Sequence, residues 1–413
     1  MARAKRFAIT DASLKHDCRR VQFAGPSLSQ HWHMDMSKES GINLLIVSYA
    51  DDSHALAVAA AMEMCGHNCV IWSEPKLAGE SVGSIALGER EIRWSVCGRN
   101  YGPSDFDLVW LRRIGSIALP EWMHADDRKF AAADNAAFFG FFWSPLSVSA
   151  RWIHSPASRL NGESKIQQLQ HAYGLGFKIP PTLISNDPDE IVQFIEACKA
   201  RGQGTVFKTF GSMTWFEKGR VLENYTSEIV VGDLIDMDVV RAVPAIYQSH
   251  VRKEYEVRST FFGGREYSVR IDSQSTDAGA IDWRAIDNLQ GVLSPTKLPA
   301  AIHDKCVALL DEMSLSMGCF DFIVDRSGDF VFVEVNQQGQ FLWIEDYLPE
   351  MRALAGFCEF VIGLVPGQPQ PGAIDFNSLV LQRICDSSRY KQLARQLAAF
   401  GTVDTKHLDK YLE

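Results

Sequence analysis

The segment 319–345, CFDFIVDRSGDFVFVEVNQQGQFLWIE, constrains the fold of this chain more than any other part of the sequence. Two apolar runs, FDFIV and FVFVEV, flank the turn DRSGD, in which Gly328 tolerates a positive φ. This pattern predicts a β-hairpin. Asp321 falls on its first strand. Glu334 and Asn336 fall on its second strand, two positions apart, so their side chains share one face.

Polar side chains on so apolar a hairpin need a compensating partner, because burying a carboxylate without one is costly. Mg²⁺ is such a partner, since it prefers carboxylate and amide oxygens together with the phosphates of a substrate. The pattern therefore indicates a site for Mg²⁺ and a nucleotide at Asp321, Glu334 and Asn336. The alternative is that Glu334 and Asn336 face solvent or cap a turn, as such residues commonly do.

The composition fits a globular protein and narrows the range of partners. The 413 residues allow two or three compact units, and 46% apolar with 22% charged residues supports a real core. A formal charge of −10 without a Lys/Arg-rich block argues against nucleic acid as a partner. No apolar run approaches the roughly 20 residues that span a bilayer. Nine cysteines without a CxxC pair suit a reducing cytosol, so we expect a cytoplasmic location and no membrane partner.

Residues 42–142 predict a small open α/β unit behind an N-terminal arm that contains the motif HWH. Buried strands are expected at 42–50 and 105–113, with a helix and a second strand between them, a short antiparallel pair at 83–97 and a long helix at 124–142. Ligands bind at the carboxyl ends of strands in such sheets, and Arg112 and Arg113 lie at one of these ends. A solvated strand terminus is the alternative.

The next part of the chain places two lysines near expected sheet elements. A helix is expected from Gly162 to Gly174, close to Lys165, and the short strand GTVFKTF carries Lys208. A glycine-bounded loop, 211–219, follows it. Further elements are expected as a helix capped by Asp187, a strand, bend and hairpin at 245–274, and helices at 299–317, 349–364 and 375–400.

This order of elements resembles an ATP-grasp ligase over residues 42–365, which implies an α/β (α+β) fold of that type. Within the superfamily the detailed sequence resembles the microviridin-type peptide ligases, the ring-forming enzymes of the graspetides. The matching phrases are LVWLRR, SKIQQLQHAYGLGFKIPPTLISNDPDEI, VFKTF, YQSHVRKEYEVRSTFFGG, IDSQ, DWR and FDFIVDRSGDFVFVEVNQQGQFLWIE. The last phrase is the most specific, because the ExN motif alone identifies only the superfamily.

The resemblance implies that Lys165 and Lys208 meet the phosphates of ATP, where a compact ammonium acts as a point charge. The hinge that reads the adenine edge, largely through backbone groups, is matched by Gln248, Ser249, His250 and Val251. The family usually has an acidic residue where this chain has Ser249, which puts only side-chain contacts in doubt. Glu256 matches the acid that orients the nucleotide, with Glu254 as its competitor.

Arg258 and Arg284 match arginines that face the transferred phosphate and the acyl-phosphate. Planar guanidinium groups suit this role, because charge develops on the γ-phosphoryl oxygens during in-line transfer. The alternative is that each arginine forms a structural salt bridge, with Glu254 or Asp282 as partner.

The resemblance implies an ATP-dependent carboxylate ligase whose Mg²⁺ is held by Asp321, Glu334 and Asn336. It would activate Asp or Glu side chains of a ribosomal precursor peptide as acyl-phosphates and join them to Ser or Thr hydroxyls or Lys amines, forming macrocycles. A ligase that joins a free amino acid or small amine to a carboxylate is a second reading. A non-catalytic nucleotide-binding protein is a third, although a degenerate site should have lost at least one of these residues.

We expect five segments along the chain. They are an arm at 1–40, a preliminary α/β domain at 41–150, a central subdomain at 151–250, a C-terminal subdomain with the metal site at 251–365, and a linker with a helical tail at 366–413. The arm and the tail lie outside the common family core. A leader peptide, a partner or a second copy of the chain, giving a homodimer, are the alternatives for what they dock.

Overall fold

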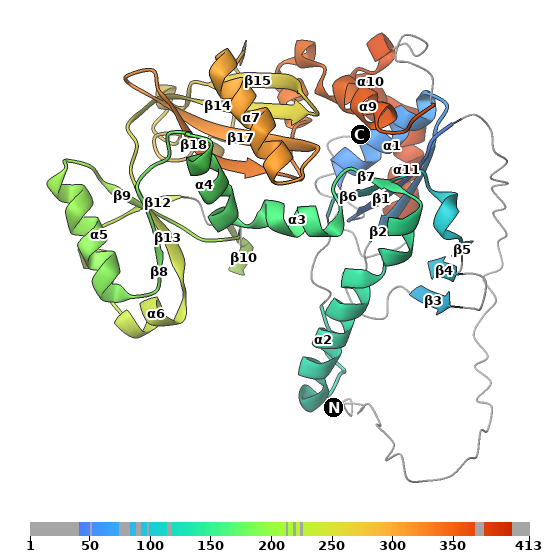
Figure 1. The fold of residues 1–413 in the computed structure, drawn as a ribbon, viewed down its shortest axis with the longest axis horizontal. Helices are drawn as coiled ribbons and strands as arrows, with labels where there is room; N and C mark the ends of the chain where they lie inside the picture. The colour runs from blue at the N-terminus through green and yellow to red at the C-terminus, as the bar shows by residue number, and fades with distance from the viewer. Residues whose placement is uncertain are drawn as a thin grey trace.

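The computed structural model shows an N-terminal unit, a central unit and a C-terminal sheet side by side, with one helix projecting from the N-terminal unit (Figure 1). It describes residues 41–49, 52–73, 83–87, 92–96, 99–113, 118–211, 214–217, 220–223, 226–367 and 376–398. The predicted arm with its HWH motif lies outside these residues. Among the residues described, no helix has the length and apolar character needed to cross a bilayer.

The N-terminal unit is a parallel sheet with strand order β2-β1-β6-β7. Its elements are β1 (Asn43–Ser48), α1 (Ser53–Met64), β2 (Asn68–Ser73), β6 (Leu108–Leu111), α2 (Ala125–Phe141) and β7 (Arg151–Trp152). A small antiparallel sheet joins β3 (Gly83–Leu87), β4 (Ile92–Val96) and β5 (Arg99–Tyr101). β1 is buried at all but its first residue, as expected for a parallel strand covered on both faces. The β-α-β order predicted for this region is confirmed.

The chain returns to this unit near its C-terminal end. The returning helices are α9 (Ala353–Gly363), α10 (Leu381–Asp386) and α11 (Ser388–Ala398). Tyr390 and Leu393 of α11 belong to the same buried apolar cluster as the alanines of α1, and Arg389 forms an ion pair with Glu63. Residues 381–398, which fall in the segment expected as a linker and helical tail, therefore pack into the core of the N-terminal unit.

The central unit is an antiparallel sheet with order β12-β9-β13-β8. Its elements are β8 (Thr182–Ser185), α5 (Pro188–Ala200), β9 (Thr205–Lys208), β12 (Ser227–Ile229), α6 (Met237–Ala242) and β13 (Ala245–Ser249). As predicted, Asp187 caps α5, which buries Ile191 and Ile195 in the core of this unit. Part of the predicted 211–219 loop is strand, because β10 (Thr214–Glu217) pairs with β11 (Arg220–Glu223). The remainder of its tip lies outside the described residues.

The C-terminal unit is an antiparallel sheet with order β16-β15-β14-β17-β18. Its elements are β14 (Lys253–Phe262), β15 (Arg265–Ile271), β16 (Leu293–Thr296), α7 (Ala300–Glu312), β17 (Met317–Asp325) and β18 (Phe330–Asn336). The predicted hairpin is β17 and β18, and Gly328 in its turn has φ 85°. Phe320, Phe322 and Phe332 pack in the core that this sheet shares with α7.

Two helices connect the units where one was predicted. They are α3 (Pro156–Glu163) and α4 (Lys165–Gly174). The break falls at Ser164, whose side-chain oxygen accepts a hydrogen bond from the backbone N–H of Gln167 and so caps α4. The helix expected to start near Gly162 therefore begins a few residues later, at Lys165.

Candidate active site

All of the predicted site residues line one cavity of about 1060 Å³, to which the central unit and the C-terminal sheet both contribute walls. They are Lys165, Lys208, Gln248, Ser249, His250, Val251, Glu256, Arg258, Arg284, Asp321, Glu334 and Asn336. The cavity slightly exceeds the roughly 300–1,000 Å³ of ordinary small-molecule sites. It therefore has room for a nucleotide and part of a second substrate.

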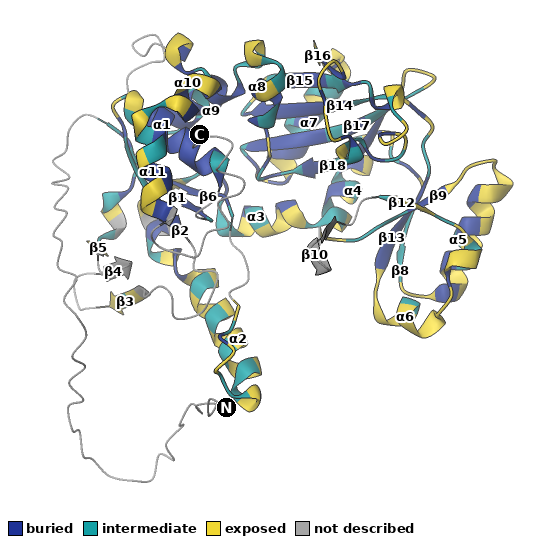
Figure 2. Ribbon diagram, turned by 180° about the vertical axis from the view of Figure 1, so that it is seen from behind, coloured by how far each residue is buried: buried dark blue, intermediate teal, exposed yellow. Residues whose placement is uncertain are grey.

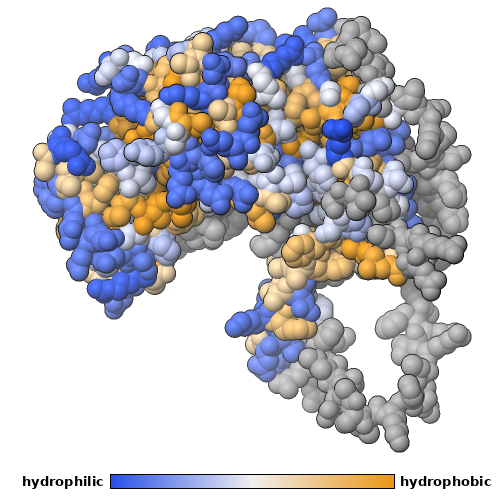
Figure 3. All heavy atoms as spheres, in the orientation of Figure 1, coloured by the Kyte–Doolittle hydropathy of each residue, from blue (hydrophilic) through white to orange (hydrophobic). Residues whose placement is uncertain are grey.

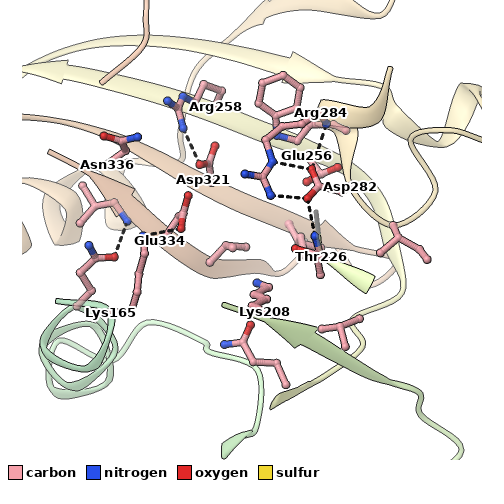
Figure 4. A pocket seen from close by; sticks show the side chains of 18 of the residues that line it. Lys165, Lys208, Thr226, Glu256, Arg258, Asp282, Arg284, Asp321, Glu334 and Asn336 are labelled. Carbon is pink, nitrogen blue, oxygen red and sulfur yellow. Dashed lines mark hydrogen bonds and ion pairs between the residues drawn. The ribbon is translucent and has the colours of Figure 1, made fainter. Parts of the chain in front are cut away.

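The hairpin presents its carboxylates to this cavity as a facing pair. Asp321 and Glu334 are directly opposite each other in the β17–β18 register, and an irregularity follows Asp321. The Asp321 Oδ2 atom accepts from Arg258 Nη1 at 2.6 Å, and Glu334 Oε2 accepts from Lys165 Nζ at 2.6 Å (Figure 4). Each carboxylate is thus held by a cation of its own.

These neighbours separate the titration of the two carboxyl groups. Attraction to Lys165 outweighs burial and lowers the pKa of Glu334 to about 2. Burial raises the pKa of Asp321, although Arg258 opposes that shift, and the charge of Glu334 adds to it. Glu334 is therefore ionised at every physiological pH, which a carboxylate ligand to a cation requires.

The donor set of the hairpin fits Mg²⁺. Two carboxylates and the amide of Asn336 approach one another from adjacent strands (Figure 4), and Mg²⁺ takes such oxygen ligands together with phosphate oxygens. The Asn336 Oδ1 atom accepts from Gly339 N at 3.0 Å, which fixes the orientation of the amide. No group of three or more His, Cys, Asp or Glu side chains suited to a metal ion occurs in the described ranges, so the hairpin site depends on the Asn336 amide as its third ligand.

The two lysines reach the cavity from different units. Lys165 begins α4, whereas Lys208 ends β9 of the central unit. Burial lowers the pKa of Lys208, although Glu334 and Asp282 attract its charge. A buried ammonium of this kind is a strong site for a phosphate, because little water competes for it.

The predicted hinge lies at the end of β13, and its polar groups are already engaged with the central unit. Gln248 donates to Thr182 Oγ1 at 3.0 Å, and Ser249 Oγ donates to Gln203 Oε1 at 2.9 Å. The backbone N–H of Ser249 bonds the carbonyl of Pro181. These side chains therefore hold the hinge in place against the central unit.

The structure separates the two candidate acids that sequence spacing left open. Glu256 lines the cavity, and its Oε1 accepts from the buried Lys253 Nζ at 2.7 Å. Glu254 is exposed and does not contribute to the lining. Burial raises the pKa of Glu256, against the attraction of Lys253. Of the two, only Glu256 lines the cavity.

The two arginines hold different carboxylates. Arg258 pairs with Asp321 in the hairpin, rather than with Glu254 as the alternative reading supposed. Arg284 does form the alternative salt bridge, since its Nε and Nη2 donate to the two oxygens of Asp282 at 2.9 and 2.5 Å. This bidentate pair also aims the guanidinium, because Asp282 is largely buried while Arg284 stays partly open to the cavity (Figure 4).

A buried arginine of the N-terminal unit holds the loop that follows the hairpin. Arg112 is 1% exposed, so the alternative reading of it as a solvated strand terminus is wrong. Its Nε lies 2.8 Å from Asp52 Oδ2, and its Nη1 donates to the carbonyls of Gln338 and Gly339 at 2.7 and 2.9 Å. Gly339 in turn donates to Asn336. A chain of contacts thus runs from the N-terminal unit to a candidate metal ligand.

Two buried histidines hold the same loop. His54 Nε2 accepts from the backbone N–H groups of Phe341 and Leu342 at 3.0 and 3.1 Å, and His154 Nε2 bonds the carbonyl of Gln337 at 2.8 Å. Burial lowers the pKa of His54 well below its ordinary value, which keeps the ring neutral and able to accept. The sequence analysis missed these histidines, because their partners lie far along the chain.

Comparison with known proteins places this geometry in context. Neither a family model nor a curated protein sequence matches the chain. Solved structures do match. The RiPP-associated ATP-grasp ligase of Chryseobacterium gregarium, solved with ADP and a leader and core peptide, is 25% identical, with a TM-score of 0.69 over 80% of this chain and 99% of that one.

Two macrocyclases of Microcystis aeruginosa MRC share the fold as well. MdnC, bound with precursor peptide MdnA, is 23% identical, with a TM-score of 0.66 over 78% of this chain and 100% of its own. MdnB is 23% identical, with a TM-score of 0.63 over 77% and 99%. The chain therefore has the ATP-grasp fold and is similar to ATP-grasp ligases. The resemblance to ligases that modify ribosomal peptides, predicted from the sequence, is confirmed.

Proposed function

We propose that this protein uses ATP and Mg²⁺ to activate Asp or Glu side chains of a ribosomal precursor peptide and joins them to Ser or Thr hydroxyls or Lys amines of the same peptide. The observation that carries the proposal is the convergence of all the predicted nucleotide, arginine and metal residues on one cavity. The solved relatives support the peptide substrate, because their structures hold a leader and core peptide or a precursor peptide.

The first step transfers the γ-phosphoryl group. A carboxylate oxygen of the peptide attacks the γ-phosphorus of ATP and ADP leaves, giving an acyl-phosphate. Lys165 and Lys208 would bind the phosphates, while Arg258 and Arg284 would stabilise the charge that develops on the transferred group. Asp321, Glu334 and Asn336 would hold Mg²⁺, which would supply positive charge against the phosphates.

The second step forms the ring. A hydroxyl or amine of the peptide attacks the acyl carbon, loses its proton, and phosphate departs with the oxygen that bridged carbon and phosphorus. No protein side chain needs to form a covalent bond with the substrate, so the rate comes from positioning and electrostatic stabilisation. Because water would destroy the acyl-phosphate, the cavity has to close around it.

The experiment that tests this proposal is mass spectrometry of a peptide encoded beside the gene, incubated with the enzyme, ATP and Mg²⁺. We expect the loss of one water mass for each bond formed, and mild base would then cleave only esters. With free amino acids added, a mass gain of one amino acid less one water would favour the second reading, ligation of a free amine. An unchanged peptide together with unchanged ATP would contradict both.

We further propose a cytoplasmic location and a homodimer. Seven of the nine cysteines lie among the described residues, and all of these are free thiols, which suits a reducing compartment.

The homodimer is supported by α2, none of whose residues is buried. It exposes Phe130, Phe138 and Phe141 to solvent as it projects from the body (Figures 1 and 3). A second copy would cover this helix symmetrically, and sedimentation of wild type and Phe141→Asp tests that.

A further inference from the structure

Two tryptophans from separate sequence motifs meet at the wall of the cavity. Trp283 comes from DWR and Trp343 from QFLWIE, and their rings stack with centroids 5.2 Å apart and planes 28° from parallel. Both line the cavity, and both are only partly buried. The nucleotide roles described above use neither ring.

Each tryptophan is tied to one of the two arginines that would face the transferred phosphate. Trp283 directly precedes Arg284. The Trp343 Nε1 atom donates to the carbonyl of Gln340 at 2.9 Å, and Arg258 Nη2 donates to the same carbonyl at 3.4 Å. The stacked rings therefore adjoin the place where the peptide carboxylate has to meet the γ-phosphate.

An apolar cluster supports the rings from behind. Its buried residues are Ile271, Ile286, Leu289, Val292 and Leu293, with Tyr347 and Leu348 packed against them. This cluster is distinct from the core of the central unit, which backs the hinge. The rings are thus fixed by packing and by the Gln340 carbonyl, and they present apolar surface to the cavity beside two guanidinium groups.

We infer that Trp283 and Trp343 form a docking platform for an apolar or aromatic side chain that flanks the reacting carboxylate in the peptide. The inference rests on the proposed function, since only a peptide brings such a neighbour. Consecutive residues of an extended peptide are about 3.5 Å apart, so a residue next to the bound Asp or Glu reaches the rings.

Removal of the platform should selectively weaken binding of the peptide. The measurement is steady-state kinetics with the precursor peptide encoded beside the gene. Combining Trp283→Ala with Trp343→Ala should raise KM for the peptide by about 10-fold or more, as loss of buried tryptophan contacts does, and leave KM for ATP unchanged. The Trp→Phe pair should retain most of the affinity. Trp122→Ala is the matched control, because Trp122 is 58% exposed and lies outside the cavity lining.

The reciprocal change is made in the peptide. The residues that flank each cross-linked Asp or Glu are replaced with Ser. This change should raise the peptide KM of the wild-type enzyme and should scarcely raise the peptide KM of the double alanine variant further. Equal peptide KM values for wild type and the double alanine variant, with Mg·ADP affinity intact, would overturn the platform. It would also be overturned if the Ser peptide raised KM by the same factor for both enzymes. A wild-type enzyme that never removes water from the peptide would instead overturn the proposed function, and the platform with it.

Discussion

The two sides of the cavity are built in different ways. On the C-terminal side, the hairpin is backed by a phenylalanine-rich core, and the loop after it is held by Arg112, His54 and His154 of the N-terminal part of the chain. On the central side, the hinge and Lys208 belong to a unit with a small core of its own, and the outer faces of that unit are largely exposed (Figure 2).

The difference indicates that the two sides of the cavity have different functions. Metal ligands have to be held within a fraction of an ångström, and many contacts from a second unit supply that rigidity. A side with few contacts to the rest of the molecule can instead close on the nucleotide and open again to release ADP. We therefore interpret the hairpin side as the fixed half and the central unit as the closing half.

The largest expected effect comes from removing metal ligands in the fixed half. Glu334→Ala combined with Asn336→Ala should lower ATP turnover by more than about 100-fold, because the charge of the phosphates is then uncompensated, while the fold persists. Steady-state ADP release and circular dichroism measure the two properties. Asp329→Ala is the matched control, since Asp329 is an exposed carboxylate in the turn of the same hairpin. Normal turnover in the double variant would contradict the metal assignment.

The next effect compares one cation from each half. Arg112→Gln removes the nearer of the two arginines paired with the buried Asp52 carboxylate and leaves Arg113 Nε at 3.7 Å, which should cost about 3 kcal/mol of stability. Lys208→Gln should change stability by less than about 1 kcal/mol, because no fixed loop depends on it, and should raise KM for ATP. Urea denaturation measures the stability of the two variants, and steady-state kinetics measures their KM for ATP. Equal stability losses in both variants would break the comparison.

The same ion pair predicts a pH dependence of stability. Burial favours a raised pKa for Asp52, but Arg112, His54, the Ser48 hydroxyl and Arg113 together outweigh it and lower the pKa to about 2, from an ordinary 3.8. The stabilisation, about 2 kcal/mol, is therefore complete above pH 4 and is lost as the pH falls toward 2. The free-energy difference between wild type and Asp52→Asn should shrink across that window. A constant difference would show that the charge of Asp52 is not its source.

The smallest effect is a difference in hydrogen exchange. Binding of Mg·ADP should slow exchange in β9 and β13, which belong to the closing half, and change β17 and β18 little. Mass spectrometry of peptic fragments with and without Mg·ADP makes the measurement. Uniform slowing across both halves would argue that the cavity closes as one body.

The sequence was sufficient to predict those features that depend on residues close together in the chain. The hairpin, its turn at Gly328 and the facing side chains follow from period-two alternation and turn residues over a short stretch. Lys165, Lys208 and the two arginines were placed by resemblance to a family, and their convergence on one cavity agrees with it.

The sequence was insufficient where contacts span the chain. Nothing near Arg112 predicts that its guanidinium bonds carbonyls more than two hundred residues later. The break at Ser164 reflects a single capping hydroxyl, which outweighed a helical pattern on both sides. The packing of α11 against α1 likewise depends on tertiary burial of Tyr390 rather than on any local signal.

The most direct test of the central claim is an isotope transfer. A precursor peptide carrying ¹⁸O in its Asp and Glu carboxylates is cyclised with ATP and Mg²⁺, and the released nucleotide and phosphate are analysed by mass spectrometry. The acyl-phosphate mechanism predicts a single ¹⁸O atom in the inorganic phosphate for each bond formed, with ADP unlabelled. Cyclised peptide with unlabelled phosphate, or label in AMP, would contradict the mechanism.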